Sequence, residues 1–401
     1  MYGQLRLGLC CINTVLRKQN IFCSRTCIRK NFTIDKAMDK ARHNILDLIR
    51  MIEWNHSNNI SCLRVSSDLF PHFTDDQTEH YTIDFARCLL KQAGDLANQY
   101  GHRILMHPGQ FNQVGAINPK VFSKTVQELV HQASILDAMG IDNNGVLIVH
   151  GGGVYHSKME TMNRWVDNFH QLPDNVKNRL VIENCERNYS VEDCLEIGKR
   201  CHIPVVLDLH HYDCWSHPQL SLKQLIPQVI ETWQSSHRRI IMHLSEQAPH
   251  LRLGAHSDYV ENIPHIIFHT IRKYSIEIDL EIEAKMKEQA IFHLYRKYYG
   301  GSGGEVFSPV SSCYPVEERS ASAHGSLVIR MKMIGSGGER ISTPNHPIGP
   351  LIRMGLLGER KSSNDVCVPV GGGEDSPCIS KPGLLIRLKL NGETKFPPKI
   401  I

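Results

Sequence analysis

The chain has 401 residues, of which 41% are hydrophobic and 21% charged, an ordinary composition for a globular protein. No apolar run approaches the roughly 18 residues needed to span a bilayer, which excludes a membrane protein. The formal net charge of +4 excludes a strongly basic domain, so a DNA-binding face would have to be a local basic patch or depend on bound cations. The 13 cysteines show no repeated CxxC spacing and follow no signal peptide, so we expect free thiols and an intracellular protein, in the nucleus of a eukaryote or otherwise in the cytoplasm.

Eight short apolar runs alternate with segments of helical periodicity, which is the pattern of βα units around a parallel sheet. In chain order, the first four units pair a strand with a helix at Gln4–Ile12 and Thr33–Asn55, Cys62–Ser67 and Thr82–Tyr100, Arg103–Pro108 and Ser123–Met139, and Gly145–His150 and Lys158–Leu172. The last four pair Leu180–Asn184 with Val191–Cys201, Pro204–His211 with Leu222–Trp233, Arg239–Ser245 with Ile263–Tyr274, and Ile278–Ala284 with Lys287–Tyr299. We predict an α/β fold, a (β/α)8 TIM barrel over residues 1–299. A doubly wound open sheet is the alternative, but no GxGxxG follows the first strand.

The composition changes after Gly300 to stretches rich in Gly, Ser and Pro, which predicts a flexible tail over residues 300–401. One short basic and apolar pattern recurs three times in it, at Leu327–Gly335, Pro350–Gly358 and Leu384–Gly392. Each copy is too short to fold alone. We expect the tail to be dispensable for activity, and its repeats could bind a protein partner weakly.

Strands three to eight each end in side chains able to bind a metal ion, at the edge where barrel active sites are built. These side chains are His107, His150, Glu183, Asp208 with His211, His243 and Glu283. Any single histidine among the 23 in the chain is more often structural, but the whole set favours a cation cluster, because polar side chains are costly there unless paired. Imidazole and carboxylate ligands suit Zn²⁺, Mn²⁺ or Fe²⁺, and the set lacks the cysteines of a closed structural zinc site. The pattern therefore indicates a catalytic metal centre.

Several local strings occur in one order along the chain. They are RLGLCCIN (Arg6–Asn13), LRVSSDLFPHF (Leu63–Phe73), MHPGQF (Met106–Phe111), VIENCE (Val181–Glu186), LDLHH (Leu207–His211), MHLSE (Met242–Glu246), GAHSDYV (Gly254–Val260) and IEAKMKEQA (Ile282–Ala290). Together they closely resemble the UV damage endonuclease family, of the endonuclease IV-like superfamily, over roughly residues 4–295.

The resemblance implies a repair enzyme that nicks the phosphodiester immediately 5′ to pyrimidine dimers, 6–4 photoproducts and some other distortions of double-stranded DNA. It implies divalent cations, usually Mn²⁺, with Zn²⁺ or Mg²⁺ as alternatives. Carried over by motif, one ion would be held by His107, His150 and Glu183, and a second by Glu183, Asp208, His243 and Glu283. His211 and His256 would face a third ion. Of these, the resemblance assigns catalysis to Glu183, His107, His150, Asp208 and Glu283.

The resemblance also suggests how the lesion is bound. Gln110 and Phe111 match a pair that resembling enzymes push into the duplex, although Phe111 could instead pack at the barrel rim. Lys285 and Lys287 could contact the DNA backbone or could be ordinary solvated lysines. The glycine run in VHGGGVYH (Val149–His156) could cradle a phosphate or form a simple turn.

Ile241 departs from the family pattern. Resembling sequences usually place a lysine two residues before the histidine of the seventh strand, where its carbamate helps to hold the third metal. We therefore expect two tight metal sites, a weak third site, and a monomeric enzyme acting on damaged DNA. The alternatives are an abasic-site endonuclease of the endonuclease IV type, a metal-dependent sugar isomerase, and a lesion-binding protein without incision. The HPGQ and EAKxKE strings disfavour the first two.

Overall fold

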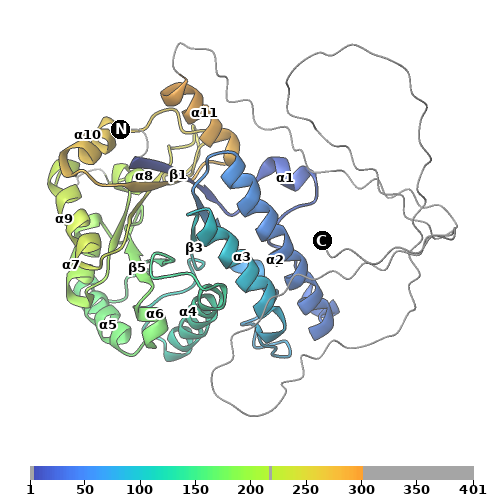
Figure 1. Ribbon diagram of the computed structural model, residues 1–401. Helices are drawn as coiled ribbons and strands as arrows, with labels where there is room; N and C mark the ends of the chain where they lie inside the picture. Colours follow the sequence, from blue (N-terminus) through green and yellow to red (C-terminus); the bar gives the residue numbers. More distant parts are fainter. Residues whose placement is uncertain (1–3, 216–218, 301–401) are drawn as a thin grey trace, which may run out of the picture. The chain divides into compact units, whose positions relative to one another are not determined.

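The computed structural model describes residues 4–215 and 219–300 (Figure 1). The first half of the barrel comprises β1 (Leu5–Cys10), α1 (Thr14–Lys18), α2 (Ile34–Ser57), β2 (Cys62–Val65), α3 (Arg87–Gln99), β3 (Arg103–Met106), α4 (Pro119–Met139) and β4 (Leu147–His150). The second half comprises α5 (Lys158–His170), α6 (Asp174–Lys177), β5 (Leu180–Glu183), α7 (Val191–Cys201), β6 (Val205–Asp208), α8 (Leu209–Asp213), α9 (Leu222–Ser235), β7 (Ile240–Leu244), α10 (His265–Tyr274), β8 (Ile278–Ile282) and α11 (Glu288–Tyr299). Three 3₁₀ turns, η2 (Arg29–Asn31), η3 (Ser67–Leu69) and η4 (Asp84–Ala86), lie in the connections. The predicted tail and its three repeats lie outside the described residues.

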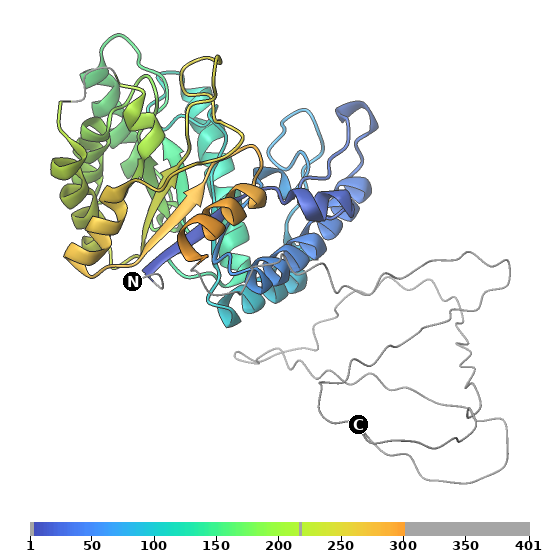
Figure 2. The same ribbon diagram turned by 90° about the horizontal axis from the view of Figure 1, so that it is seen from above.

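The eight strands form one closed parallel barrel in sequence order, and β1 pairs with β8 to complete it. Figures 1 and 2 show the helices lying around the outside of the sheet, from α2 and α3 on one side to α9 and α10 on the other. The predicted (β/α)8 barrel is therefore confirmed. No helix in residues 4–215 and 219–300 is long and apolar enough to cross a bilayer.

Local sequence signals fix many of the helix ends. Ser190 and Asp193 form a reciprocal capping box at the start of α7, and Asn118 caps α4 with Pro119 in its first turn. Gly140 ends α4 in the left-handed region at φ 69°, a conformation that glycine adopts without strain. These short-range bonds set where each helix begins and ends, and thus where each strand meets the rim.

Several predicted boundaries were wrong. The sixth strand was expected to reach His211, but β6 ends at Asp208, because the Asp208 side chain accepts a 2.7 Å hydrogen bond from the His211 backbone N–H and caps the short helix α8. The helices α1, α6 and α8 were not predicted, since each has at most five residues and carries little periodicity. The predicted helix at Ile263–Tyr274 begins only at His265, directly after Pro264.

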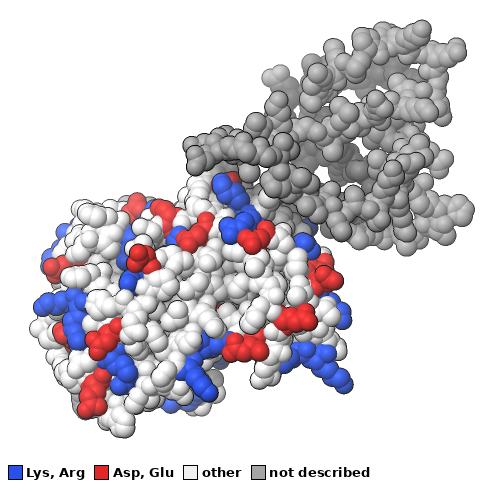
Figure 3. Space-filling model, turned by 90° about the horizontal axis from the view of Figure 1, so that it is seen from below, with Lys and Arg blue, Asp and Glu red and all other residues white. Residues whose placement is uncertain are grey.

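The charged surface is mixed in sign. Figure 3 shows one face of the molecule, on which lysine and arginine side chains are interspersed with aspartate and glutamate. No single-sign patch dominates that face, as expected from a net charge of only +4. If DNA binds this barrel, neutralisation of the phosphates would depend on local groups rather than on a broad basic field.

Candidate metal centre

The candidate site is built at the carboxyl ends of β3 to β8. His150, Glu183 and Asp208 are the last residues of β4, β5 and β6. His243 lies within β7, and its register partner in the neighbouring strand β6 is Asp208, just as His150 is paired with Glu183. His107 and Glu283 each lie one residue beyond a strand, after β3 and β8. The barrel thus brings these side chains to one edge.

Glu183 is the hub of the cluster and is only 1% exposed. Its Oε2 lies 2.9 Å from His107 Nε2 and 3.8 Å from His150 Nε2. Its Oε1 lies 2.9 Å from His243 Nδ1. One carboxylate therefore contacts histidines on both sides, which is the geometry that a bridging ligand requires.

Ligand atoms gather into two groups that share Glu183. In the first, atoms of His107, His150 and Glu183 all lie within 4.8 Å of one another, and in the second so do atoms of Glu183, Asp208 and His243. Among the described residues, Asp208 Oδ2 and His150 Nδ1 are buried without a hydrogen-bond partner. Unpartnered donors and acceptors of this chemistry fit a divalent cation such as Mn²⁺ or Zn²⁺.

The surroundings of the two buried carboxylates shift their pKa values in opposite directions. Burial alone would raise the pKa of Glu183, but His243, His150 and His107 outweigh it and hold that pKa well below its usual range. Burial raises the pKa of Asp208, and the nearby Glu183 adds to the effect. Burial lowers the pKa of His150 to about 4, which keeps this imidazole neutral and able to ligate a cation.

Glu283 has an arginine partner that the sequence did not predict. Its Oε1 lies 3.6 Å from His243 Nδ1, but also 2.5 Å from the guanidinium of the part-buried Arg64 on β2. Its Oε2 lies 3.6 Å from His256 Nδ1. Glu283 therefore lies between His243, which belongs to the second group of ligands, and His256, and Arg64 holds it in place.

The residues expected around a third ion belong to neither of the two groups of ligand atoms. The rings of His211 and His256 are 6.2 Å apart, and His211 Nδ1 lies 3.0 Å from the Asn184 carbonyl oxygen. Ile241 is fully buried and has no ligand atom to offer. Glu246 points to another loop, where it accepts the backbone N–H groups of residues 261 and 262.

Sequence reasoning missed two buried residues beside the cluster. His210 lies on α8 with its ring 5.7 Å from that of His256. Glu281 on β8 is fully buried with its Oε2 3.0 Å from His243 Nε2. The alternation of Asp279, Glu281 and Glu283 along one strand was a readable signal, because residues two apart face the same side of a strand.

The residues expected to touch DNA lie on loops at this edge. Phe111, beyond His107, is 69% exposed for so large an apolar ring, and Gln110 beside it is also exposed. The ring of Phe111 folds over Gly109, where a Cβ would approach it to 2.5 Å. Phe111 therefore contacts the rim at Gly109, but most of its ring is exposed to solvent. Lys285 is exposed 3.7 Å from Asp258, and Lys287 is half-buried with φ 51°.

The glycine run after β4 is explained by packing at its first residue. A Cβ on Gly151 would lie 2.3 Å from the ring of the buried Tyr189, so this position needs glycine. The hydroxyl of Tyr155 donates to Gln113, which joins this loop to the loop after β3. Packing thus explains the first glycine of the run, and the phosphate cradle stays a prediction.

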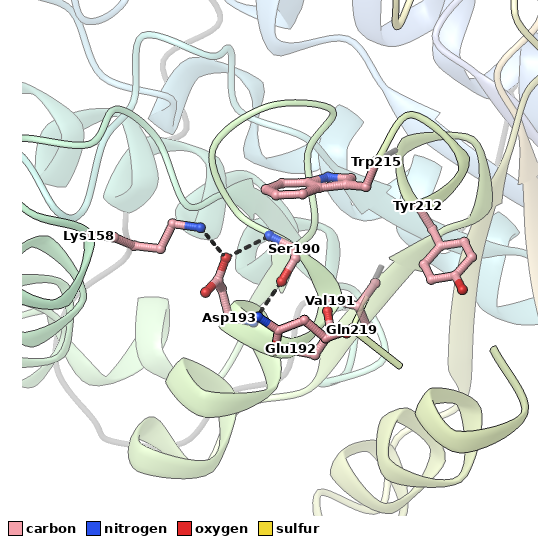
Figure 4. A pocket seen from close by; sticks show the side chains of 8 residues that line it. All are labelled: Lys158, Ser190, Val191, Glu192, Asp193, Tyr212, Trp215 and Gln219. Atoms are coloured by element: carbon pink, nitrogen blue, oxygen red, sulfur yellow. Dashed lines mark hydrogen bonds and ion pairs between the residues drawn. The ribbon is translucent and has the colours of Figure 1, made fainter. Parts of the chain in front are cut away.

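A separate small cavity of about 110 Å³ lies at the start of α7, away from the ligand groups (Figure 4). Lys158 Nζ contacts Asp193 Oδ2 at 2.8 Å and lies over the ring of Trp215. The indole N–H of Trp215 donates to the carbonyl oxygen of Cys185 at 2.9 Å. This cavity thus belongs to the packing that joins the segment after α8 to the loop after Glu183.

Taken together, fold and site define a (β/α)8 barrel with a buried histidine and carboxylate cluster at the carboxyl ends of its strands. The family model for the UV-endonuclease UvdE matches residues 5–309. The chain belongs to the UV-damage endonuclease family.

Individual relatives agree with this assignment. The chain is 39% identical over 312 residues to the UV-damage endonuclease of Schizosaccharomyces pombe, a match covering 73% of this chain and 50% of that protein. It is 35% identical over 302 residues to the putative UV-damage endonuclease of Acanthamoeba polyphaga mimivirus, covering 74% of this chain and 92% of that protein. The crystal structure of SacUVDE superposes with a TM-score of 0.64 at 30% identity, covering 71% of this chain and 95% of that one. The chain thus spans about half the length of the fission yeast relative.

Proposed function

We propose that this protein is a divalent-cation-dependent DNA repair endonuclease that nicks the phosphodiester 5′ to UV photoproducts. The observation that carries the proposal is Glu183, a buried, anionic carboxylate shared by two groups of ligand atoms in a member of this family. Bound cations would supply an activated water and neutralise the phosphate. No nucleophilic side chain is then needed from the protein.

In this proposal the chain's own residues hold and orient the cations. His107, His150 and Glu183 would hold one, and Glu183, Asp208 and His243 with Glu283 a second. Arg64 fixes Glu283 through the 2.5 Å ion pair. We propose Mn²⁺ as the working cation, with Zn²⁺ and Mg²⁺ as alternatives.

The third ion should be weakly held. Ile241 offers no charge, and Glu246 is engaged with backbone N–H groups elsewhere. The carboxylates near His211 and His256 are Asp208, Glu183 and Glu283, which the first two ions would already use. Two tight ions per chain are therefore expected. Metal analysis that finds three tight ions would contradict this part of the proposal.

Lesion recognition would use the loops at the same edge. Phe111, which is exposed, would enter a distorted base stack together with Gln110, where unstacking costs least because the pairing is already damaged. Lys285 and Lys287 are the proposed contacts to the phosphate backbone. Damaged double-stranded DNA is thus the proposed substrate, bound by a single copy of the chain.

The test is incubation of purified protein and Mn²⁺ with UV-irradiated, undamaged and abasic supercoiled plasmids. We expect nicking of the irradiated plasmid above both others, abolished by EDTA. Nicking of the abasic plasmid alone would favour an abasic-site endonuclease instead. Binding to irradiated DNA without nicking, in any divalent cation, would make the protein a lesion-binding module.

A further inference from the structure

Glu281 is a buried carboxylate that the two ligand groups do not use. It lies on β8 directly opposite His243 on β7 and is fully buried inside the barrel. On its other side it is paired with Gly8 of β1, where a Cβ would approach Glu281 Cγ to 3.2 Å and Cys62 Cβ to 3.0 Å. The glycine on β1 therefore leaves the room that this side chain occupies.

The imidazole of His243 lies between two sets of carboxylates. Its Nδ1 faces the cluster, 2.9 Å from Glu183 Oε1, and its Nε2 lies 3.0 Å from Glu281 Oε2 on the opposite side. The Nε2 contact is short but poorly aligned, and within the described residues neither Glu281 oxygen nor His243 Nε2 has a hydrogen-bond partner. The 3.0 Å contact with His243 Nε2 is shorter than the 4.0 Å contact of Glu281 Oε2 with Arg64 Nη1.

An additional cation site is the competing explanation, because Cys10 Sγ and oxygens of Glu281 and Glu283 lie within 4.8 Å of one another. The guanidinium of Arg64 argues against it. Its Nη1 lies 2.5 Å from Glu283 and 4.0 Å from Glu281, so positive charge already stands at this group. A cation there would be repelled by Arg64, whereas a neutral imidazole N–H would not.

We propose that Glu281 is the positioning residue of His243, an inference that rests on the proposed metal assignment. By accepting the Nε2–H, its carboxylate selects the tautomer whose Nδ1 lone pair faces the cation. It also makes the imidazole a stronger donor, as carboxylates behind metal-bound histidines do. Ile241, two residues before His243 on the same strand, supplies no such charge, so the anion behind this ligand comes from β8.

The test compares the full-length protein with Glu281→Gln and Glu281→Leu, without DNA. Mn²⁺ binding is measured by calorimetry and by the electron paramagnetic resonance of free Mn²⁺. We expect the number of bound ions to be unchanged and the affinity to fall in the order Glu, Gln, Leu, by about 10–100-fold for Leu. Gln should be intermediate because it can accept the N–H but carries no charge.

A second readout separates positioning from a structural role. In urea, the unfolding midpoint of the metal-free protein should stay the same or rise in Glu281→Leu, because the change removes a buried carboxylate that forms no well-aligned hydrogen bond. The matched control is Glu128→Gln on α4, a buried glutamate bonded to Thr74 and Gln132, which should leave Mn²⁺ affinity unchanged.

Two results would overturn the inference. The first is that both Glu281 variants bind Mn²⁺ with wild-type affinity, even if their unfolding midpoint in urea is lower. The other is loss of one whole ion while the rest bind normally, which would make Glu281 a ligand beside Cys10. A wild-type protein that binds no Mn²⁺ would instead refute the metal assignment, so the two failures are distinguishable.

Discussion

The two ends of the barrel bury the same kind of side chain with opposite partners. At the amino-terminal end of the strands, Asp279 is fully buried and paired with arginines, with Oδ1 2.6 Å from Arg6 Nε and Oδ2 2.8 Å from Arg103 Nη1. At the carboxyl end, Glu183 is equally buried but faces histidines. The strand β8 contributes to both ends, with Asp279 at one and Glu281 at the other.

The difference teaches how to separate stability from function among buried acids. An arginine side chain is permanently charged and is part of the protein, so the negative charge of Asp279 is neutralised whether or not a ligand binds. A histidine can be neutral, so the carboxylates that face histidines at the carboxyl end keep a net negative charge, which a bound cation can neutralise. A buried carboxylate paired only with arginines, such as Asp279, is therefore predicted to be structural, whereas one that also faces histidines, such as Glu183 or Glu283, can bind a cation.

The largest expected effect lies at the carboxyl end. Glu183→Gln removes the shared charge of both ligand groups, so incision of UV-irradiated plasmid in Mn²⁺ should fall by about 10³-fold or more, the equivalent of several kcal/mol of lost cation stabilisation. Bound metal, measured by atomic emission, should fall with it. The matched control is Glu196→Gln at an exposed position of α7, which should cut normally. A Glu183→Gln variant that retains its activity would remove Glu183 from the proposed centre.

The next effect lies at the amino-terminal end of the strands, where we expect a loss of stability without a loss of Mn²⁺ binding. Asp279→Asn leaves Arg103 buried without its counter-charge, so the free energy of unfolding in urea should fall by about 3–5 kcal/mol. Mn²⁺ affinity of the protein that remains folded at low temperature should not change. Asp95→Asn, which breaks the exposed pair with Lys91, is the control and should stay within about 0.5 kcal/mol. A loss of Mn²⁺ affinity in Asp279→Asn would mean that the two ends are coupled.

Much of the barrel could be predicted from sequence, because its strands are short apolar runs and each is followed by a periodic helix. That alternation predicts parallel strands, and the structure shows that they close in sequence order as a barrel and do not form the alternative doubly wound sheet. Strand ends were less predictable, as at β6, where the side chain of Asp208 stops the strand by capping α8. Such a bond depends on where the next turn folds, which periodicity does not reveal.

The candidate site divides in the same way. His107, His150, Glu183 and Asp208 could be found because strand-end residues of a parallel barrel must converge. Arg64 could not be found from sequence, and the alternation on β8 could place Glu281 inside the barrel but not against His243, because both contacts join residues far apart in the chain. The solvent exposure of Phe111 likewise emerged only from the folded loop.

A smaller effect is expected at the rim, where exposure rather than burial marks function. Phe111→Ala should reduce the preference for irradiated over undamaged duplex by about 1–3 kcal/mol in binding free energy, since stacking of one ring is lost. Metal content should be unchanged. Ile117→Ala, which shortens another exposed apolar side chain of the loop after β3, is the control for lost surface area. Equal preference in Phe111→Ala and wild type would leave Phe111 a packing residue.

The smallest effect concerns a buried histidine that is paired with no acid in residues 4–215 and 219–300. His131 on α4 stacks on Phe73 with ring centroids 3.6 Å apart, and burial lowers its pKa from the ordinary 6.5 to about 3. The folded protein therefore binds fewer protons at His131 than the unfolded chain below pH 6.5. Stability from this group is complete above that pH and is lost as the pH falls toward 3, at about 1.4 kcal/mol per pH unit.

His131→Phe keeps an aromatic ring but cannot take up a proton. Between pH 7 and pH 5, in EDTA to keep cations out, its free energy of unfolding in urea should fall by about 2 kcal/mol less than that of wild type. The absolute stability of the variant can shift with packing, so the slope with pH is the quantity to compare. His170→Phe at an exposed position of α5 serves as the matched control. An unchanged slope in His131→Phe would mean that water or a proton reaches this ring in the folded state, and that partners alone do not decide the charge of a buried histidine in this barrel.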